Sequence, residues 1–308
     1  LSYFLIATPF AQIISPKISN WLLKFGTSEV VDGVTVTYPR LLGMAGWQWV
    51  YIFWGIPALI LGLVVLWYLT DKPRQAKWLT DEEKVALENE LENERVLKSG
   101  RRKMTFGQAM AQPKVYLLAL AYFCTVTCSY SIEFFMPSVI KAWYNMSLDS
   151  VTWWIILPPL GALAGQIIAG RSSDHFQERR WHAIVPILIG AVAVGCVPFT
   201  KGNIYMTIIV FTLVFAGFKS YMPAFWSLPN MFLVQTAAAG SIGFINSVGN
   251  LGGFLGPTFT GFLAKKTGSF DAGLHYLAGF MLLSASIIFI LTRGMKTHDG
   301  APQAAPKS

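Results

Sequence analysis

The sequence predicts an all-α membrane protein, and three observations support that prediction. The 308-residue chain is 54% hydrophobic and only 13% charged, about half the charged fraction of an ordinary soluble domain. Its charge-free runs are long enough for membrane helices, which need about 20 mostly apolar residues. Lys and Arg gather in the loops of one side, so the net charge of +8 reflects membrane topology. We therefore expect no nucleic-acid partner.

The charge-free runs mark eight expected helices. Most runs suit one membrane crossing each, but the run 220–264 is too long for a single helix. We expect it to hold the end of one helix and the whole of the next, with a break near Pro229–Asn230. The eight expected helices cover 1–24, 46–70, 113–140, 150–171, 183–200, 204–228, 236–264 and 272–294.

The segment 71–112 separates two of these helices from the other six. If it lies in the cytoplasm, that side holds sixteen Lys and Arg residues and the opposite side seven, while Lys219 stays within a helix. This bias follows the positive-inside rule and predicts the orientation. Thr80 and Glu83 have the spacing of a capping box, which predicts a short charged helix over 81–98 that lies near the headgroups.

A charged motif follows the fourth expected helix. The stretch Gly170-Arg-Ser-Ser-Asp174-His-Phe-Gln-Glu-Arg179-Arg180 resembles the G-x-x-x-D-x-x-x-x-R-R loop signature of the major facilitator superfamily. The resemblance implies a cytoplasmic gate made by Gly170, Asp174, Arg179 and Arg180, in which the aspartate pairs with arginine in one conformation. The alternative is a charge cluster that only follows the positive-inside rule.

Further segments are similar to a narrower group, the anion:cation symporter family. They are Gly46–Gly55, Tyr68–Pro73, Glu178–His182, Phe225–Pro229 and Ile245–Gly253. Members of that family transport small organic anions such as sugar acids, tartrate-like dicarboxylates and aromatic carboxylates, many by proton symport. The resemblance implies secondary active transport by alternating access, and it implies a multi-pass protein of the bacterial inner membrane.

The resemblance also implies a domain layout. Transporters of this fold have two six-helix halves joined by a long loop. Residues 1–70 then supply the last two helices of the N-terminal half, 71–112 the central cytoplasmic loop, and 113–296 the C-terminal half. We expect residues 297–308 to form a disordered cytoplasmic tail. The chain would thus hold the last eight of twelve membrane helices, with four more upstream.

Two charged residues, Glu133 and Lys219, fall inside expected helices. A charge at mid-membrane costs at least about 2.5–3.5 kcal/mol on insertion scales, so it normally faces a partner or a wet cavity. We expect a charge pair or a relay for protons and substrate, in which Lys219 attracts a carboxylate and Glu133 neutralises Lys219 in the empty site. Their depths differ, because Glu133 lies about 10 Å and Lys219 about 22 Å from the outer ends of their helices. A purely structural ion pair is the alternative.

Trp226 and Ser227 follow Lys219 by seven and eight residues, on roughly the same helix face. A ring and a hydroxyl beside an ammonium suit a carboxylated, partly apolar substrate, which makes both residues candidate contacts. The alternative for Trp226 is an anchor at the membrane interface, where Trp is common.

Three more polar residues are candidate substrate contacts. Asn246 and Asn250 are four residues apart on one helix face, where amides need hydrogen-bond partners. They either contact the substrate or join two helices. Tyr130, one turn before Glu133, is a further candidate. The glycines between 249 and 256, with Pro257, are expected to let helices approach closely and bend.

Other chemistries are not indicated. Cys124, Cys128 and Cys196 lie in apolar runs, which favours structural thiols over a disulfide framework or a zinc site. The sequence offers neither a nucleophile with its base nor a phosphate-binding loop, so we expect no enzyme activity, no cofactor and no metal. The expected protein is a monomer in a lipid bilayer that binds a small carboxylate and protons. Alternatives are an uncoupled facilitator and a transporter-like sensor or non-transporting remnant.

Overall fold

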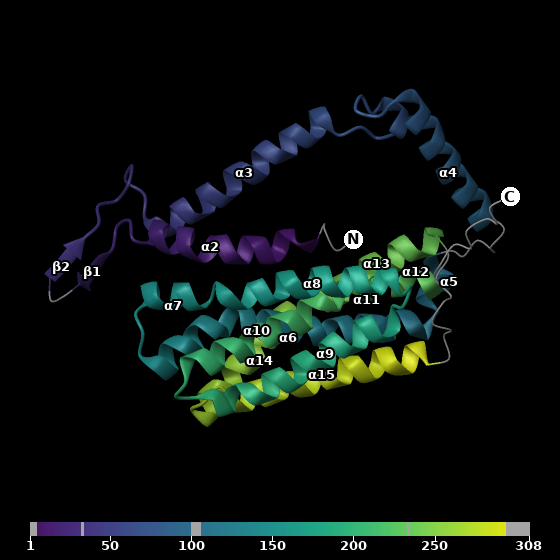
Figure 1. Cartoon of the computed structure of the whole chain (residues 1–308). Coiled ribbons are helices and arrows are strands. Elements are labelled where there is room, and N and C mark those ends of the chain that lie inside the picture. The colour runs from purple at the N-terminus through teal and green to yellow at the C-terminus, as the bar shows by residue number, and fades with distance from the viewer. Residues whose placement is uncertain (1–4, 32–33, 100–105, 233–234, 294–308) are drawn as a thin grey trace. The chain divides into compact units, whose positions relative to one another are not determined.

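The computed structural model describes residues 5–31, 34–99, 106–232 and 235–293. Two compact units make up the chain, and Figure 1 shows their elements. The larger unit comprises Leu1–Pro16 and Met104–Ser308, and the smaller comprises Lys17–Lys103. The predicted tail 297–308 lies outside the described residues.

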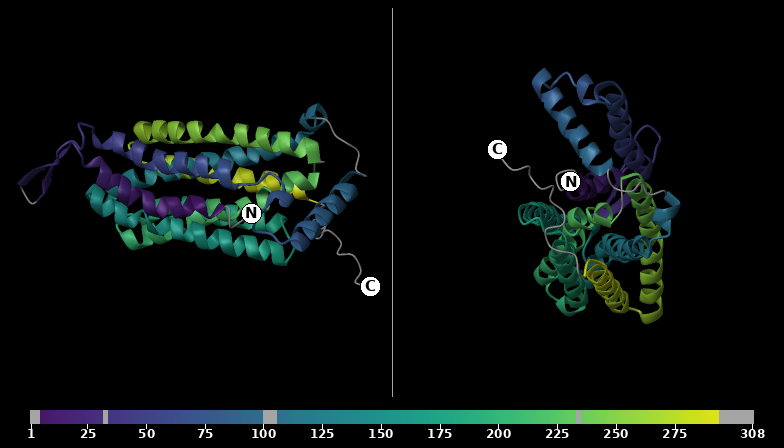
Figure 2. Two further views of the ribbon diagram at one scale, coloured as in Figure 1. Left: turned by 90° about the horizontal axis from the view of Figure 1, so that it is seen from above. Right: turned by 90° about the vertical axis from the view of Figure 1, so that its right-hand side faces the viewer.

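The larger unit is a bundle of helices that run along a common direction (Figure 2). Its elements after the beginning of α2 (Ala7–Leu23) are α5 (Phe106–Met110), α6 (Pro113–Tyr144), α7 (Leu148–Trp154), α8 (Leu157–His175), α9 (Arg180–Cys196), η2 (Val197–Thr200), α10 (Ile204–Ser220), α11 (Met222–Phe225), α12 (Leu228–Phe232), α13 (Gln235–Asn250), α14 (Gly252–Thr267) and α15 (Asp271–Thr292). Helix α6 packs against α13, α14 and α15, and α10 packs against α8 and α9. Helix α15 joins the two groups, because it contacts both α6 and α9.

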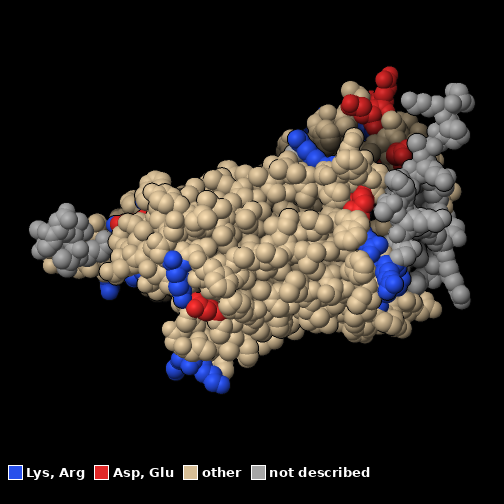
Figure 3. Space-filling model, turned by 60° about the horizontal axis from the view of Figure 1, so that its bottom comes forward, with Lys and Arg blue, Asp and Glu red and all other residues tan. Residues whose placement is uncertain are grey.

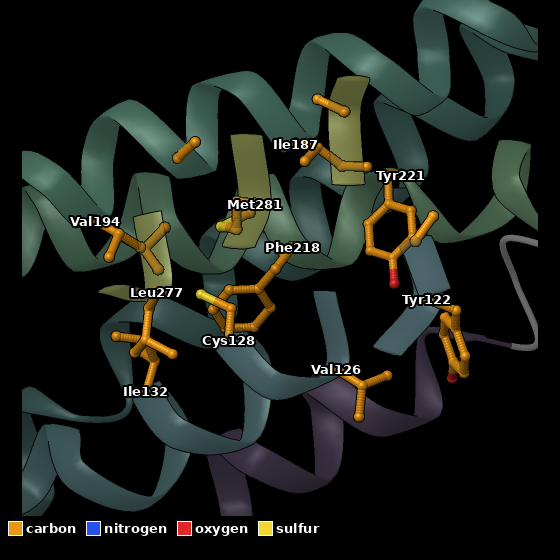
Figure 4. Close-up of a cluster of buried hydrophobic side chains, with 14 of the residues drawn as sticks. Tyr122, Val126, Cys128, Ile132, Ile187, Val194, Phe218, Tyr221, Leu277 and Met281 are labelled. Carbon is orange, nitrogen blue, oxygen red and sulfur yellow. The ribbon is translucent and has the colours of Figure 1, made fainter. Parts of the chain in front are cut away.

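The core of this bundle is apolar and closely packed. Figure 4 shows part of it, where Phe218 of α10, Cys128 of α6 and Met281 of α15 lie among one another. Tyr221, also buried, hydrogen-bonds to the hydroxyl of Thr125 across 2.6 Å. Within a bilayer, dispersion contacts and interhelical hydrogen bonds of this kind hold helices together, because lipid tails are as apolar as the side chains.

The outer surface also suits a bilayer. On the face seen in Figure 3, charged side chains lie toward the two ends and leave a broad uncharged surface between them. Among the described residues, six helical segments are long and apolar enough to cross a membrane: Gly46–Tyr68, Pro113–Tyr144, Leu148–His175, Arg180–Thr200, Ile204–Phe225 and Asp271–Thr292. The other two predicted helices are not among these segments. In the described part of the chain, α2 has 17 residues, and the predicted helix 236–264 is divided into α13 and α14 with 16 residues each.

The predicted helix over 236–264 is interrupted. Leu251 separates α13 from α14, although its dihedral angles stay helical at φ −59° and ψ −27°. The side chain of Asn250 donates to the carbonyl of Asn246 at 2.8 Å, which competes with the helical hydrogen-bond ladder. Gly252 and Gly253 follow directly, and glycine favours the helix least after proline. The prediction of one unbroken helix here was wrong.

The predicted helix over 204–228 is also divided, into α10 and α11. Pro223 has no N–H group to donate to the carbonyl of Lys219 four residues earlier, so the ladder breaks near Tyr221. The predicted helix over 150–171 is divided for the same reason, because Pro158 and Pro159 stand at the start of α8.

The smaller unit contains the rest of α2, a short hairpin, a long helix and the charged connector. The hairpin pairs β1 (Ser28–Val31) with β2 (Val34–Thr37) in antiparallel register, and it was not predicted. Helix α3 (Gly46–Tyr68) carries no charge and is mostly apolar, and η1 (Pro73–Gln75) follows it.

The charged connector is helix α4 (Asp81–Ser99), and its start was predicted correctly. The backbone N–H of Thr80 donates to Glu83 Oε2 at 2.9 Å, and the N–H of Glu83 donates to Thr80 Oγ1 at 3.3 Å. These reciprocal bonds are those of a capping box, and they satisfy two N–H groups that the first turn leaves without helical partners.

Candidate functional site

The structure brings Glu133 of α6 and Lys219 of α10 together. Lys219 Nζ lies 2.8 Å from Glu133 Oε1, which also accepts a hydrogen bond from Ser129 at 2.9 Å. The two side chains are only 11% and 23% exposed, respectively. The ammonium also lies 5.5 Å from the centre of the Phe218 ring. A charge pair inside otherwise apolar helices offers one cation that an incoming anion could reach and one acid that could take up a proton.

The helix ends explain how residues predicted at different depths can meet. Helix α6 continues to Tyr144, so Glu133 lies about 16 Å from its outer end at the usual helical rise. Helix α10 begins at Ile204, which places Lys219 about 22 Å from its own outer end. The difference of about 6 Å is within the combined reach of a lysine and a glutamate side chain.

A cavity of about 110 Å³ adjoins Glu133 within the larger unit. Its walls are mostly apolar and come from α2, α6, α8 and α10, with Gln12, Ser15 and Glu133 as their polar members. Gln12 Oε1 is buried there and has no hydrogen-bond partner. An unpaired buried acceptor beside a carboxylate suits a site that holds a water molecule or a ligand donor.

Trp226 and Ser227 do not lie beside Lys219 as two further turns of one helix. They lie between α11 and α12, after the division at Tyr221. The Trp226 ring packs edge-on against Tyr122 at 4.9 Å between centroids, and Ser227 donates to the carbonyl of Pro223 at 3.1 Å. The prediction that the helix of Lys219 extends to 228 was therefore wrong, because both residues lie beyond Phe225. Both remain partly exposed.

The two predicted asparagines lie on α13 and bond to each other. The Asn250 amide donates to the carbonyl of Asn246 at 2.8 Å and to its side-chain oxygen at 3.1 Å. Both residues are exposed, so they keep capacity for a ligand. Tyr130 is 48% exposed and lies beside Gly253, where an added Cβ would stand 3.3 Å from the ring.

The predicted gate residues lie where α8 ends and α9 begins. Arg179 Nη1 lies 2.6 Å from Asp174 Oδ1 and also donates to Ser173 Oγ at 2.8 Å. The turn between them contains Gln177 with a φ of 49°, a left-handed conformation that reverses the chain. Gly170 is buried in α8, one turn before Asp174. The ion pair between Asp174 and Arg179 therefore joins two residues of the same motif.

Arg180, the fourth predicted gate residue, is placed differently. Its guanidinium lies over the rings of Trp181 and Phe289, at 5.1 and 4.7 Å from their centres. Among the described residues, no carboxylate pairs with it. The structure thus pairs Asp174 with Arg179 and not with Arg180.

Sequence reasoning missed three features near these sites. Ser129 stands four residues before Glu133, a spacing that could have revealed its hydrogen bond to the carboxylate. Gln12 is polar within an apolar run, but its place in the cavity depends on tertiary packing. The two ring nitrogens of His182 lie 2.8 Å from Glu178 Oε2 and 2.8 Å from Ser172 Oγ. The same Glu178 carboxylate also accepts a hydrogen bond from the backbone N–H of Trp181 in α9.

The possible metal ligands and the three cysteines are placed as follows in the described part of the chain. No group of three or more His, Cys, Asp or Glu side chains there could hold a metal ion. Cys124 and Cys128 are buried and unbonded, while Cys196 is exposed and also free.

Comparisons with known proteins agree with this architecture. The family model described as Major Facilitator Superfamily matches residues 1–143 and 118–307. The chain is 36% identical over 292 residues to a protein of Agrobacterium vitis whose name designates it a tartrate transporter, covering 94% of this chain and 61% of that one. It is 31% identical over 291 residues to the metabolite transport protein NicT of Pseudomonas putida, covering 94% and 64%.

A solved structure shares the fold. The proton:xylose symporter XylE, bound to 6-bromo-6-deoxy-D-glucose, superposes with a TM-score of 0.68 at 16% identity, covering 97% of this chain and 65% of that one. The chain spans 61% to 65% of the length of three curated relatives that it matches at 31% to 36% identity.

Proposed function

Because the chain belongs to the Major Facilitator Superfamily, we propose that it forms the greater part of a secondary active transporter of small organic anions. The substrate class is a sugar acid, a tartrate-like dicarboxylate or an aromatic carboxylate, and transport is coupled to protons. Relatives named for tartrate and metabolite transport support this class. The proposed setting is the inner membrane of a bacterium, with the protein acting as a monomer.

The observation that carries the proposal is the ion pair between Lys219 and Glu133. A membrane helix bundle retains such charges at a considerable energetic cost, and they commonly mark substrate or proton pathways. In the empty site, Glu133 neutralises Lys219. A substrate carboxylate would compete with Glu133 for the ammonium, since both are anions that bind the same cation.

Proton coupling follows from that competition. Two carboxylates close to one cation repel each other, so binding is easier when one of them is protonated. Protonation of Glu133 would release Lys219 to the substrate, and one proton would then travel with each substrate. We propose Trp226, Ser227, Asn246, Asn250 and Tyr130 as further substrate contacts.

The gate motif supports the alternating-access part of the proposal. The pair between Asp174 and Arg179 joins the end of α8 to the start of α9, and the aspartate is 66% exposed. A surface pair of this kind is worth less than about 1 kcal/mol. It can therefore form and break within a transport cycle at little cost.

Transport by the reconstituted protein tests the proposal. Liposomes that enclose a pH-sensitive dye would receive sugar acids, dicarboxylates or aromatic acids, while labelled substrate uptake is measured in parallel. We expect uptake with internal acidification, no uptake by Lys219→Met, and loss of substrate-driven acidification in Glu133→Gln. Lys265→Met, which changes an exposed lysine at the end of α14, is the matched control.

The outcomes separate the proposed mechanism from its alternatives. Full uptake by Lys219→Met would overturn the role of the ion pair. Uptake without proton entry would indicate a facilitator, and it would remove Glu133 from the mechanism. Substrate binding without any uptake would favour a sensor.

A further inference from the structure

A second cavity lies far from the ion pair in sequence, between α9 and α15. Its volume is about 390 Å³. Its walls come from two helices: Trp181, Ile184 and Leu188 of α9, and Ala285, Ser286, Phe289 and Ile290 of α15. Trp181, Phe289 and Ile290 are 45%, 39% and 66% exposed, so the cavity is an open groove on the outer face of two membrane-spanning helices. We call it the α9–α15 groove.

One end of the groove carries an unpaired positive charge. Arg180 is the first residue of α9, and Ile184 and Leu188 follow it at intervals of four along the same helix face. Its guanidinium lies over Trp181 and Phe289, the two aromatic residues of the groove. Arg180 Nε is buried without a hydrogen-bond partner, and among the described residues no carboxylate or carbonyl accepts from this side chain.

The two carboxylates nearest to Arg180 in the motif have other partners. The Glu178 carboxylate accepts from the backbone N–H groups of Trp181 and His182 and from the His182 ring. Asp174 is paired with Arg179. The residue that follows α15, Arg293, adds a further positive charge at this end of the two helices.

We propose that the α9–α15 groove binds one anionic phospholipid, with its phosphate on Arg180 and an acyl chain along Ile184, Leu188 and Ile290. An arginine fork suits a phosphate, and basic pockets between membrane helices on the cytoplasmic side bind anionic headgroups. From Arg180 to Leu188 the groove runs about 12 Å along α9, enough for the upper part of an acyl chain. The aromatic rings hold the guanidinium at the mouth of the groove through cation–π contacts.

This site is separate from the proposed transport site, since it opens on the lipid-facing surface and uses none of the same residues. The proposal also gives Arg180 a role in lipid binding, which is distinct from the gate role that the motif implies. Arg179 and Arg180 are adjacent in the motif, yet one pairs with Asp174 and the other stands at the groove.

Native mass spectrometry of the full chain tests the proposal. The detergent-purified protein would be mixed with equal amounts of the anionic lipid POPG and the zwitterionic lipid POPC, and the bound lipids would be counted. We expect preferential retention of POPG. Arg180→Gln should weaken that retention by about fivefold, the factor that one basic residue contributes near an anionic lipid surface.

Two further variants make the result specific. Ser286→Phe fills the groove from an exposed position without changing any charge, and we expect it also to lower POPG retention. Arg171→Gln removes an arginine from α8, which does not line the groove, and should leave retention unchanged.

The proposal is overturned if the unaltered protein shows no preference for POPG, or if Arg171→Gln and Arg180→Gln weaken retention equally, since that would indicate a diffuse charge effect. Normal POPG retention by Ser286→Phe would overturn it as well. If Arg180→Gln does not fold, as judged by its melting temperature, the Ser286→Phe result decides alone.

Discussion

Replacing Lys219 with Met leaves the Glu133 carboxylate in the membrane without its cation. At 2.8 Å the two charges attract each other by about 6 kcal/mol at an effective dielectric constant of about 20. Desolvation of both ions offsets most of that attraction, so the net value of the pair is small. Removing one partner has a larger effect, because the remaining charge keeps its desolvation cost and loses the attraction that offset it. The resulting loss in the free energy of unfolding is typically about 3–5 kcal/mol.

We therefore expect Lys219→Met and Glu133→Gln each to lower the free energy of unfolding by about 3 kcal/mol, since both side chains keep some solvent contact. The double variant should lose no more than either single variant, because it leaves no unpaired charge. The coupling energy of the cycle would then be about 3 kcal/mol.

Unfolding by SDS in mixed micelles, followed by tryptophan fluorescence, measures the four free energies. Lys201 and Asp271 provide a matched control pair, with 2.9 Å between Nζ and Oδ2 but side chains 43% and 37% exposed. Their cycle should give less than about 1 kcal/mol. If the losses from Lys219→Met and Glu133→Gln simply add in the double variant, the two charges do not depend on each other and the reasoning is refuted.

Three other predictions follow from local geometry. Gly217→Ala would place a Cβ 2.5 Å from the α9 backbone and should lower the free energy of unfolding by about 1–3 kcal/mol in the same assay. Gly195→Ala should not destabilise the protein, because the nearest atom to its added Cβ is 3.9 Å away. Hydrogen bonds from Thr80 hold the pKa of Glu83 below its ordinary 4.5, so the capping box stabilises α4 above pH 4.5 and loses this stabilisation as the pH falls through the lowered pKa. Hydrogen exchange of the first-turn amides of α4 should accelerate over that pH range. Thr80→Val should abolish this pH dependence. Asp174→Asn should leave the melting temperature nearly unchanged but alter the transport rate; a large loss of stability would instead indicate a structural role.

Patterns that depend on local sequence were predictable. Long uncharged runs located the membrane-spanning helices, and the spacing of Thr80 and Glu83 located the start of α4. The motif from Gly170 to Arg180 placed Asp174 and Arg179 at one turn. These features depend on residues that are close in the chain, where helical geometry fixes which side chains can meet.

Some features escaped prediction because they depend on tertiary packing, such as the place of Gln12 in the cavity beside Glu133. Others are local but have competing outcomes. The Asn250 side chain bonds to Asn246 one turn earlier in the same helix and not to another helix, and the same bond accompanies the break at Leu251. Pro223 divides the predicted helix before Trp226, although the residue was visible in the sequence. Whether a proline bends a helix or divides it depends on which neighbouring donors satisfy the carbonyl that the proline leaves free.

The seam between α6 and the α13–α14 segments has a consequence of another kind. Gly249 lies against the ring of Tyr122, and Gly252 and Gly256 lie against the backbone and hydroxyl of Thr127, so an added methyl group at any of them would collide with α6. The glycines bring the backbone of α13 and α14 close to α6, while the Phe244 ring of α13 still packs edge-on against Tyr116 of α6, 5.4 Å between centroids. The seam therefore resists substitution at its glycines, because the space that any larger residue would need is already filled by α6.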